Sequence, residues 1–117
     1  MTCLNPTEED RLRIFLAAEL ARRTRALGLR LNAPEAVSLI ADEIHFAARA
    51  GKGYDEVVAA GMHALSEEQV MDGVADIVTQ IRVEVLLDEG SRLIVLPHPI
   101  GTGSRATASI SPVGERA

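Results

Sequence analysis

The spacing of apolar residues changes near residue 80, and this change restricts the folds that the chain can adopt. Before it, apolar side chains recur every three or four positions, a period typical of amphipathic helices. After it, Ile81, Val83, Val85 and Leu87 recur at every second position, as in a strand with one buried face. The order of the two periods predicts an α+β domain with about four helices followed by a C-terminal β-hairpin.

The first two helices are expected to start with the same capping chemistry. Asn5 and Asn32 can each accept a main-chain hydrogen bond, and Glu8 or Glu35, three positions later, completes a capping box. Gly28 is expected to end the first helix in the left-handed conformation that suits glycine. The apolar stripe expected to be buried on the first helix consists of Leu12, Phe15, Leu16 and Leu20. The inward face expected on the second helix consists of Val37, Ile40, Ile44 and Ala47 or Ala48.

Two further helices are predicted before residue 80. The third is expected over residues 54–62, with Val57 and Val58 facing inward. Ser66 and Gln69 form a capping box that predicts the start of a fourth helix. Gly73 would weaken that helix by about 1 kcal/mol relative to alanine. The side of the fourth helix expected to be buried consists of Val70, Val74, Ile77 and Val78.

The hairpin is expected to consist of strands over residues 81–87 and 92–96, with a turn over 88–91. Pro97 ends the second strand, because proline cannot donate to a strand ladder. An isolated two-stranded hairpin is marginal in water, so it must pack on the helices or join a sheet in another chain. Because Leu86 would lie on the side opposite the other apolar residues, we expect residues 81–96 to be partly buried by a partner.

Length and composition favour one small domain. The chain has 117 residues, of which 47% are apolar, enough for one core and too few residues for two domains. We expect the domain to span residues 1–100. Residues 101–117 are rich in Gly, Ser, Thr, Ala and Pro without periodicity, and are interpreted as a mobile tail or linker.

Charge and cysteine usage argue against several classes of function. The net charge of −5 is unsuited to nucleic acid, because phosphate binding requires a dense basic surface. The only basic cluster has acidic residues nearby and consists of Arg22, Arg23, Arg25 and Arg30. No apolar run is long enough to span a bilayer, and Glu8, Glu9 and Asp10 lie where a signal peptide would be apolar. A single cysteine, Cys3, favours a reducing, cytoplasmic location.

The residues that could carry catalysis or bind metal are few. Asp42 and His45 lie at positions i and i+3, and His63 could approach them as a third metal ligand. No metalloenzyme signature accompanies them, so an ion pair on the helix surface is the favoured interpretation. His98 lies between two prolines as a rigid, exposed imidazole, either a contact residue or solvated, and Cys3 has no neighbour that would lower its pKa. The residues alone therefore indicate no catalytic, cofactor-binding or metal-binding site.

Five motifs in order resemble the gamma subunit of urease over residues 1 to about 100. The first comprises Leu4, Pro6, Glu8, Asp10 and Leu12. The most specific is Gly28-Leu29-Arg30-Leu31-Asn32-Ala33-Pro34-Glu35-Ala36. The others are Ala48-Arg49 with Gly51-Lys52, then Val70-Met71-Asp72-Gly73-Val74, then Val83-Glu84 with Asp88, Gly90, Leu93 and Pro99-Ile100. The sequence departs from the family pattern at Leu27, Ala33, Pro97 and the length of the turn after Asp88.

The resemblance implies a structural role without catalysis by this chain. Urease hydrolyses urea to ammonia and carbamate with two nickel ions, and the family places the nickel ligands and the catalytic histidine on the alpha subunit. The implied partners are the alpha and beta subunits, in an alpha–beta–gamma unit that is expected to trimerise. In lineages with fused gamma and beta chains, the linker would begin where residues 101–117 stand.

Two other hypotheses stay open at this point. One is a diverged gamma-like interaction module that no longer joins a urease, for which the only support is the proline at position 97 and the loss of the family's arginine before Gly28. The other is an independent metal-dependent enzyme using Asp42, His45 and His63. Copurification with the large subunit tests the first, and metal analysis of the isolated chain tests the second.

Overall fold

The computed structural model of the chain describes residues 6–101. It confirms the expected α+β order, with helices followed by an antiparallel two-stranded hairpin. The elements are α1 (Pro6–Ala26), α2 (Ala33–Arg49), α3 (Tyr54–Met62), a one-turn 3-10 helix (Glu67–Gln69), α4 (Val74–Ile77), β1 (Gln80–Leu87) and β2 (Gly90–Pro97).

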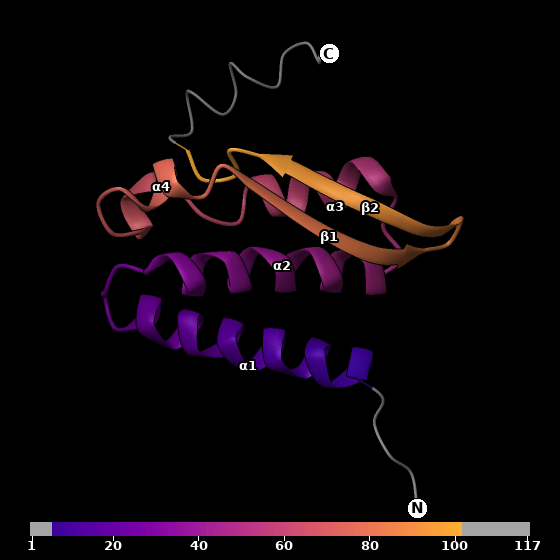
Figure 1. The fold of residues 1–117 in the computed structure, drawn as a ribbon, viewed down its shortest axis with the longest axis horizontal. Helices are drawn as coiled ribbons and strands as arrows, with labels where there is room; N and C mark the ends of the chain where they lie inside the picture. The colour runs from indigo at the N-terminus through magenta and orange to yellow at the C-terminus, as the bar shows by residue number, and fades with distance from the viewer. Residues whose placement is uncertain (1–5, 102–117) are drawn as a thin grey trace, which may run out of the picture.

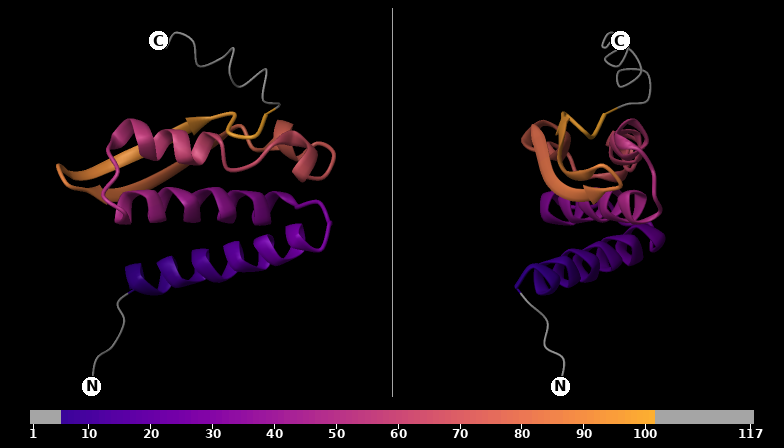
Figure 2. Two further views of the ribbon diagram at one scale, coloured as in Figure 1. Left: turned by 180° about the vertical axis from the view of Figure 1, so that it is seen from behind. Right: turned by 90° about the vertical axis from the view of Figure 1, so that its right-hand side faces the viewer.

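The elements form three layers with α2 in the middle. Figure 1 shows α1 along one side of α2, with the hairpin and α3 together on the other side. The edge-on view in Figure 2 separates the hairpin and α3 within that upper layer. The core lies between α2 and the upper layer, and its largest fully buried aliphatic side chains are Leu31, Leu39, Ile40, Ile44, Ile94, Leu96 and Ile100. Gly61 lets α3 approach this core closely, because a Cβ there would clash with Leu96 Cδ1.

The predicted boundaries of the first two helices agree with the structure. Gly28 has φ 81°, the left-handed conformation expected after α1. Asn5 lies outside the described residues. At the start of α2, the Glu35 amide donates to Asn32 Oδ1 at 2.9 Å, and the Asn32 amide donates to Glu35 Oε1 at 2.9 Å. This reciprocal capping box explains why α2 begins at Ala33.

Most of the expected inward face of α2 is correct, but one residue is not. Ile40, Ile44 and Ala47 are buried, whereas Val37 is 37% exposed. Val37 lies on the side of α2 that faces the space between α1 and β1, where it lines a groove instead of the core.

The predicted continuous fourth helix is wrong. Val70 is extended, with φ −119° and ψ 160°, because Leu31 forms a parallel bridge with it. The Leu31 amide donates to the Gln69 carbonyl, and the Met71 amide donates to the Leu31 carbonyl at 2.8 Å. The capping box at Ser66 therefore opens only one turn of 3-10 helix.

Gly73 separates this bridge from the short α4. Its φ of 88° places it in the left-handed region, so it stands before α4 and not inside a longer helix. Val74 is buried as expected, but Ile77 is 70% exposed, because the helix ends there and its side chain points outward.

The hairpin agrees with the alternation in the sequence. β1 and β2 pair from Gln80 opposite Pro97 to Leu87 opposite Gly90, leaving Asp88 and Glu89 as the loop. Gly90 has φ 118°, which suits glycine and not a residue with a side chain. The side chains that face the helices and are buried are Ile81, Val85, Leu87, Ile94 and Leu96.

Candidate functional site

The predicted burial of the leucine stripe on α1 is wrong. Leu12, Leu16 and Leu20 are 47%, 66% and 60% exposed, and they lie on the side of α1 turned away from α2. Phe15 is half-buried and packs edge-to-face on Phe46 of α2, with ring centroids 6.2 Å apart. The leucines do share one face of a helix, but helical spacing alone does not show whether such a face packs in the chain's own core or lies on the surface.

The side of α1 that contacts α2 combines small and basic residues. Ala18 and Ala21 are fully buried, so the two helices can approach closely. Arg11 and Arg22 extend to Asp42 on α2, each with a guanidinium nitrogen 2.7 Å from a different carboxylate oxygen. These ion pairs explain why the basic and small side, and not the leucine side, faces inward.

Asp42 is therefore not part of a surface pair with His45, as the sequence suggested. It is the one fully buried charged residue in the described part of the chain. Both carboxylate oxygens accept charge-assisted hydrogen bonds, which satisfies its buried charge. Burial opposes the charge on Arg22, but hydrogen bonds to Glu43, Asp42 and Glu19 outweigh burial and raise the pKa of Arg22 above its usual value. Asp42 is accordingly positioned to fasten α1 to α2.

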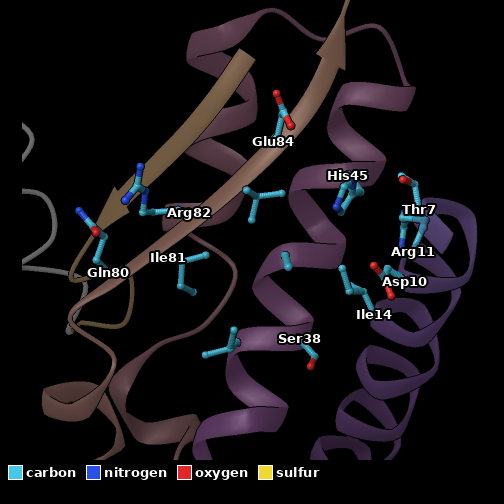
Figure 3. A pocket seen from close by; sticks show the side chains of 13 residues that line it. Thr7, Asp10, Arg11, Ile14, Ser38, His45, Gln80, Ile81, Arg82 and Glu84 are labelled. Carbon is cyan, nitrogen blue, oxygen red and sulfur yellow. The ribbon is translucent and has the colours of Figure 1, made fainter. Parts of the chain in front are cut away.

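A groove of about 510 Å³ lies next to this ion-pair cluster, between α1 and β1. Its floor is the side of α2 that carries Val37 and Ala41, and its walls include Ile14 and Ile81. Figure 3 shows His45 projecting from α2 into the groove, with Asp10 and Arg11 on one side and Arg82 and Glu84 on the other. The groove thus has an apolar floor and charges of both signs along its rim.

His45 is the titratable group most affected by this environment. Burial lowers the pKa of His45 below its usual value of 6.5, and the positive charge of Arg11 lowers it further, while the negative charge of Asp42 opposes both. His45 is therefore neutral at physiological pH, and an uncharged imidazole is compatible with the apolar groove.

The remaining candidates lie apart from one another. His63 is at the C-terminal end of α3, where its Nδ1 is 2.9 Å from the Ala59 carbonyl oxygen. His98 is exposed, as expected, and has φ 45°. Cys3 lies outside the described residues. Within residues 6–101, no group of three or more His, Cys, Asp or Glu could hold a metal ion.

Two of the four arginines of the basic cluster are paired with carboxylates. Arg22 pairs with Asp42, Glu43 and Glu19, and Arg30 lies 3.1 Å from Asp72. The ion-pair cluster and the groove were both missed from the sequence. The available signal was the spacing of Arg11, Ala18 and Arg22, which places two arginines and a small residue on one helical face.

The described residues form a small α+β domain with two exposed apolar features, the leucine stripe and the groove, and without a group of three or more His, Cys, Asp or Glu that could hold a metal ion. A family model described as "Urease, gamma subunit" matches residues 1–100. The chain therefore belongs to the urease gamma subunit family.

Two relatives illustrate the similarity. The "Urease subunit gamma/beta" of Streptomyces avermitilis is 56% identical over 100 residues, which cover 86% of this chain and 44% of the relative. The protein of the same name from Streptomyces coelicolor is 51% identical over 100 residues, with the same coverage of 86% and 44%. The chain thus spans less than half the length of these relatives. In the described part of the chain, every helix is too short or too polar to cross a membrane.

Proposed function

We propose that this chain is a structural, non-catalytic gamma subunit of a nickel-dependent urease, which hydrolyses urea to ammonia and carbamate in the cytoplasm. Its family supports the subunit role. The names of its relatives, which contain gamma and beta together, support the beta subunit as a partner. We further propose residues 1–100 as the gamma-like domain, residues 101–117 as a tail or linker, and an alpha–beta–gamma unit that trimerises.

The exposed leucine stripe on α1 is the observation that carries the structural role. Leu12, Leu16 and Leu20 are between 47% and 66% exposed, and Leu27, directly after the end of α1, is 64% exposed. Contiguous apolar surface of this kind is typical of permanent subunit interfaces. Because α1 binds α2 through its opposite side, the stripe is available to another chain without rearrangement of this fold.

Nickel does not fit the residues that the structure describes. Neither the pair Asp42 and His45 nor the distant His63 provides three converging ligands within residues 6–101. Both oxygens of Asp42 are already bound by arginines. We therefore assign the two nickel ions and the catalytic residues to the alpha subunit, and no step of urea hydrolysis to this chain.

Affinity purification of the tagged chain from its native cells tests this proposal. We expect the alpha and beta subunits to copurify and the eluate to release ammonia from urea. An eluate with the alpha subunit but no activity would indicate a urease without nickel. An eluate without the alpha subunit would contradict the proposal and favour the diverged interaction module.

A further inference from the structure

The outer edge of β1 has main-chain groups that no described segment uses. The His98 amide donates to the Thr79 carbonyl at 2.8 Å, in register with the hairpin. In an antiparallel ladder, hydrogen-bonded pairs of residues alternate with pairs that are not hydrogen-bonded. Counting from Thr79 and His98, the pairs of Ile81 with Leu96 and of Val83 with Ile94 are therefore hydrogen-bonded. Pro97, which has no amide hydrogen, occupies a pair of the other type, as this alternation requires.

Arg82, Glu84 and Leu86 therefore direct their amides and carbonyls away from β2. The sheet contains only two strands in the described chain, and no main-chain hydrogen bond links these three residues to another described segment. An unpaired strand edge is a template for one more strand.

The groove described above lies along this same edge. Figure 3 shows β1 bordering the groove, with α2 forming its floor and α1 its far wall. Val83 and Ile81 of β1 contribute apolar side chains, as do Val37 and Ala41 of α2. A second hollow shares Val37, Ser38 and Gln80 with the groove and extends it along α2. A strand added to β1 would place every second side chain in this apolar space.

The charges along β1 further define the segment that fits. Arg82 and Glu84 are exposed and take part in no ion pair or side-chain hydrogen bond with another described residue. In an added strand, the residues opposite Arg82 and Glu84 lie on the same face, two positions apart. Complementary partners are an acidic residue opposite Arg82 and a basic residue opposite Glu84, with an apolar residue between them.

We propose that an extended segment of another urease subunit pairs with the free edge of β1 and inserts an apolar side chain into the adjacent groove. The segment has an acidic and a basic residue on either side of the inserted one. This inference rests on the proposed function, because it takes the alpha and beta subunits as the source of the strand.

Matched proline variants of the full chain, coexpressed with the alpha and beta subunits, test this inference. Glu84→Pro removes an outward amide from β1, and Leu93→Pro removes the outward amide of the opposite residue on β2. Neither variant removes a hydrogen bond between the strands. We expect Glu84→Pro to weaken assembly at least about tenfold, the loss expected when main-chain pairing is disrupted. Leu93→Pro should assemble as the unmodified chain does, and Glu84→Gln separates loss of the charge from loss of the amide.

Amide hydrogen exchange within the assembled complex provides a second readout, which does not depend on the variants folding. We expect the amides of Arg82, Glu84 and Leu86 to be protected, while those of Ser91, Leu93 and Val95 exchange. Equal effects of the two prolines, or equal exchange along both edges, would overturn the inference and leave the proposed function intact. If the unmodified chain does not assemble with the alpha and beta subunits, the proposed function and this inference both fail.

Discussion

Asp42 shows how one residue determines which side of a helix is buried. A buried carboxylate is costly unless it is paired and hydrogen-bonded. Arg11 and Arg22, about three turns apart on α1, satisfy both of its oxygens at 2.7 Å. This requirement turns the basic side of α1 inward and leaves its leucines outside.

Replacing Asp42 with asparagine tests this interpretation. We expect Asp42→Asn to lower the free energy of unfolding by about 2–4 kcal/mol, because Arg11 loses its counter-charge and Arg22 loses the buried one of its three carboxylate partners. Chemical denaturation followed by circular dichroism measures the change. Asp10→Asn is the control, since Asp10 and Arg13 form an exposed pair 3.7 Å apart and such pairs contribute roughly 0–1 kcal/mol. Equal losses in the two variants would contradict the role of Asp42.

His45 makes the stability of the protein depend on pH. Its pKa in the folded chain lies below 6.5, so the unfolded chain binds a proton at a higher pH than the folded chain does. The stability that neutral His45 contributes is therefore complete above about pH 6.5 and is lost as the pH falls below that value. We expect the unfolding temperature of His45→Gln to fall less than that of the unmodified chain between about pH 7.5 and pH 5. Replacing the exposed His63 with glutamine should leave the decline as it is in the unmodified chain. If His45→Gln showed the same pH dependence as the unmodified chain, His45 would not be its cause.

At the scale of elements, the sequence predicted those whose determinants are local. The capping box of Asn32 and Glu35 and the alternation of Ile81 to Leu87 each involve neighbours in the chain. The segment after Ser66 was predicted wrongly, because its conformation depends on Leu31, some forty residues away. Helical spacing of valines could not indicate that Val70 would be extended by this bridge.

Gly73 provides a test in which the two interpretations predict opposite signs. In a continuous helix, Gly73→Ala would stabilise the chain by about 1 kcal/mol. With φ 88°, the same variant instead forces alanine into the left-handed region and should destabilise it by about 1 kcal/mol. Gly73→Asn should lose less stability than Gly73→Ala, because asparagine tolerates this conformation. Equilibrium denaturation of the three proteins distinguishes the interpretations, and stabilisation by alanine would contradict the structure.

At the scale of the molecule, the candidate site was the least predictable part. The ion-pair cluster and the groove depend on how α1 lies on α2, and no local pattern encodes the distance from Arg22 to Asp42. The leucine stripe was visible in the sequence, but its environment was not, because periodicity does not distinguish a core face from an interface. The resemblance to the urease gamma subunit did identify the family, since its motifs follow one another along residues 1–100.

Leu16 tests the role of the stripe in the whole molecule. We expect Leu16→Glu to fold normally, because the side chain is 66% exposed, but to lose assembly with the alpha and beta subunits. Leu16→Met preserves the apolar surface and should assemble. Size-exclusion chromatography of the coexpressed subunits measures assembly, and thermal unfolding of each variant checks the fold. If Leu16→Glu assembled as well as the unmodified chain, the leucine stripe would not be part of the interface.

The layered arrangement also separates the two ends of the described chain. Pro6 begins α1 in the outermost layer, whereas Gly101 pairs with Ser66 in the layer on the other side of α2 (Figure 1). Any polypeptide joined beyond Gly101 therefore departs from the face opposite the leucine stripe. If residues 101–117 are the linker proposed above, the domain would act as a spacer between a covalent attachment on one face and the proposed leucine interface on the other. Lengthening such a linker would change the reach of whatever it tethers without altering how α1 docks.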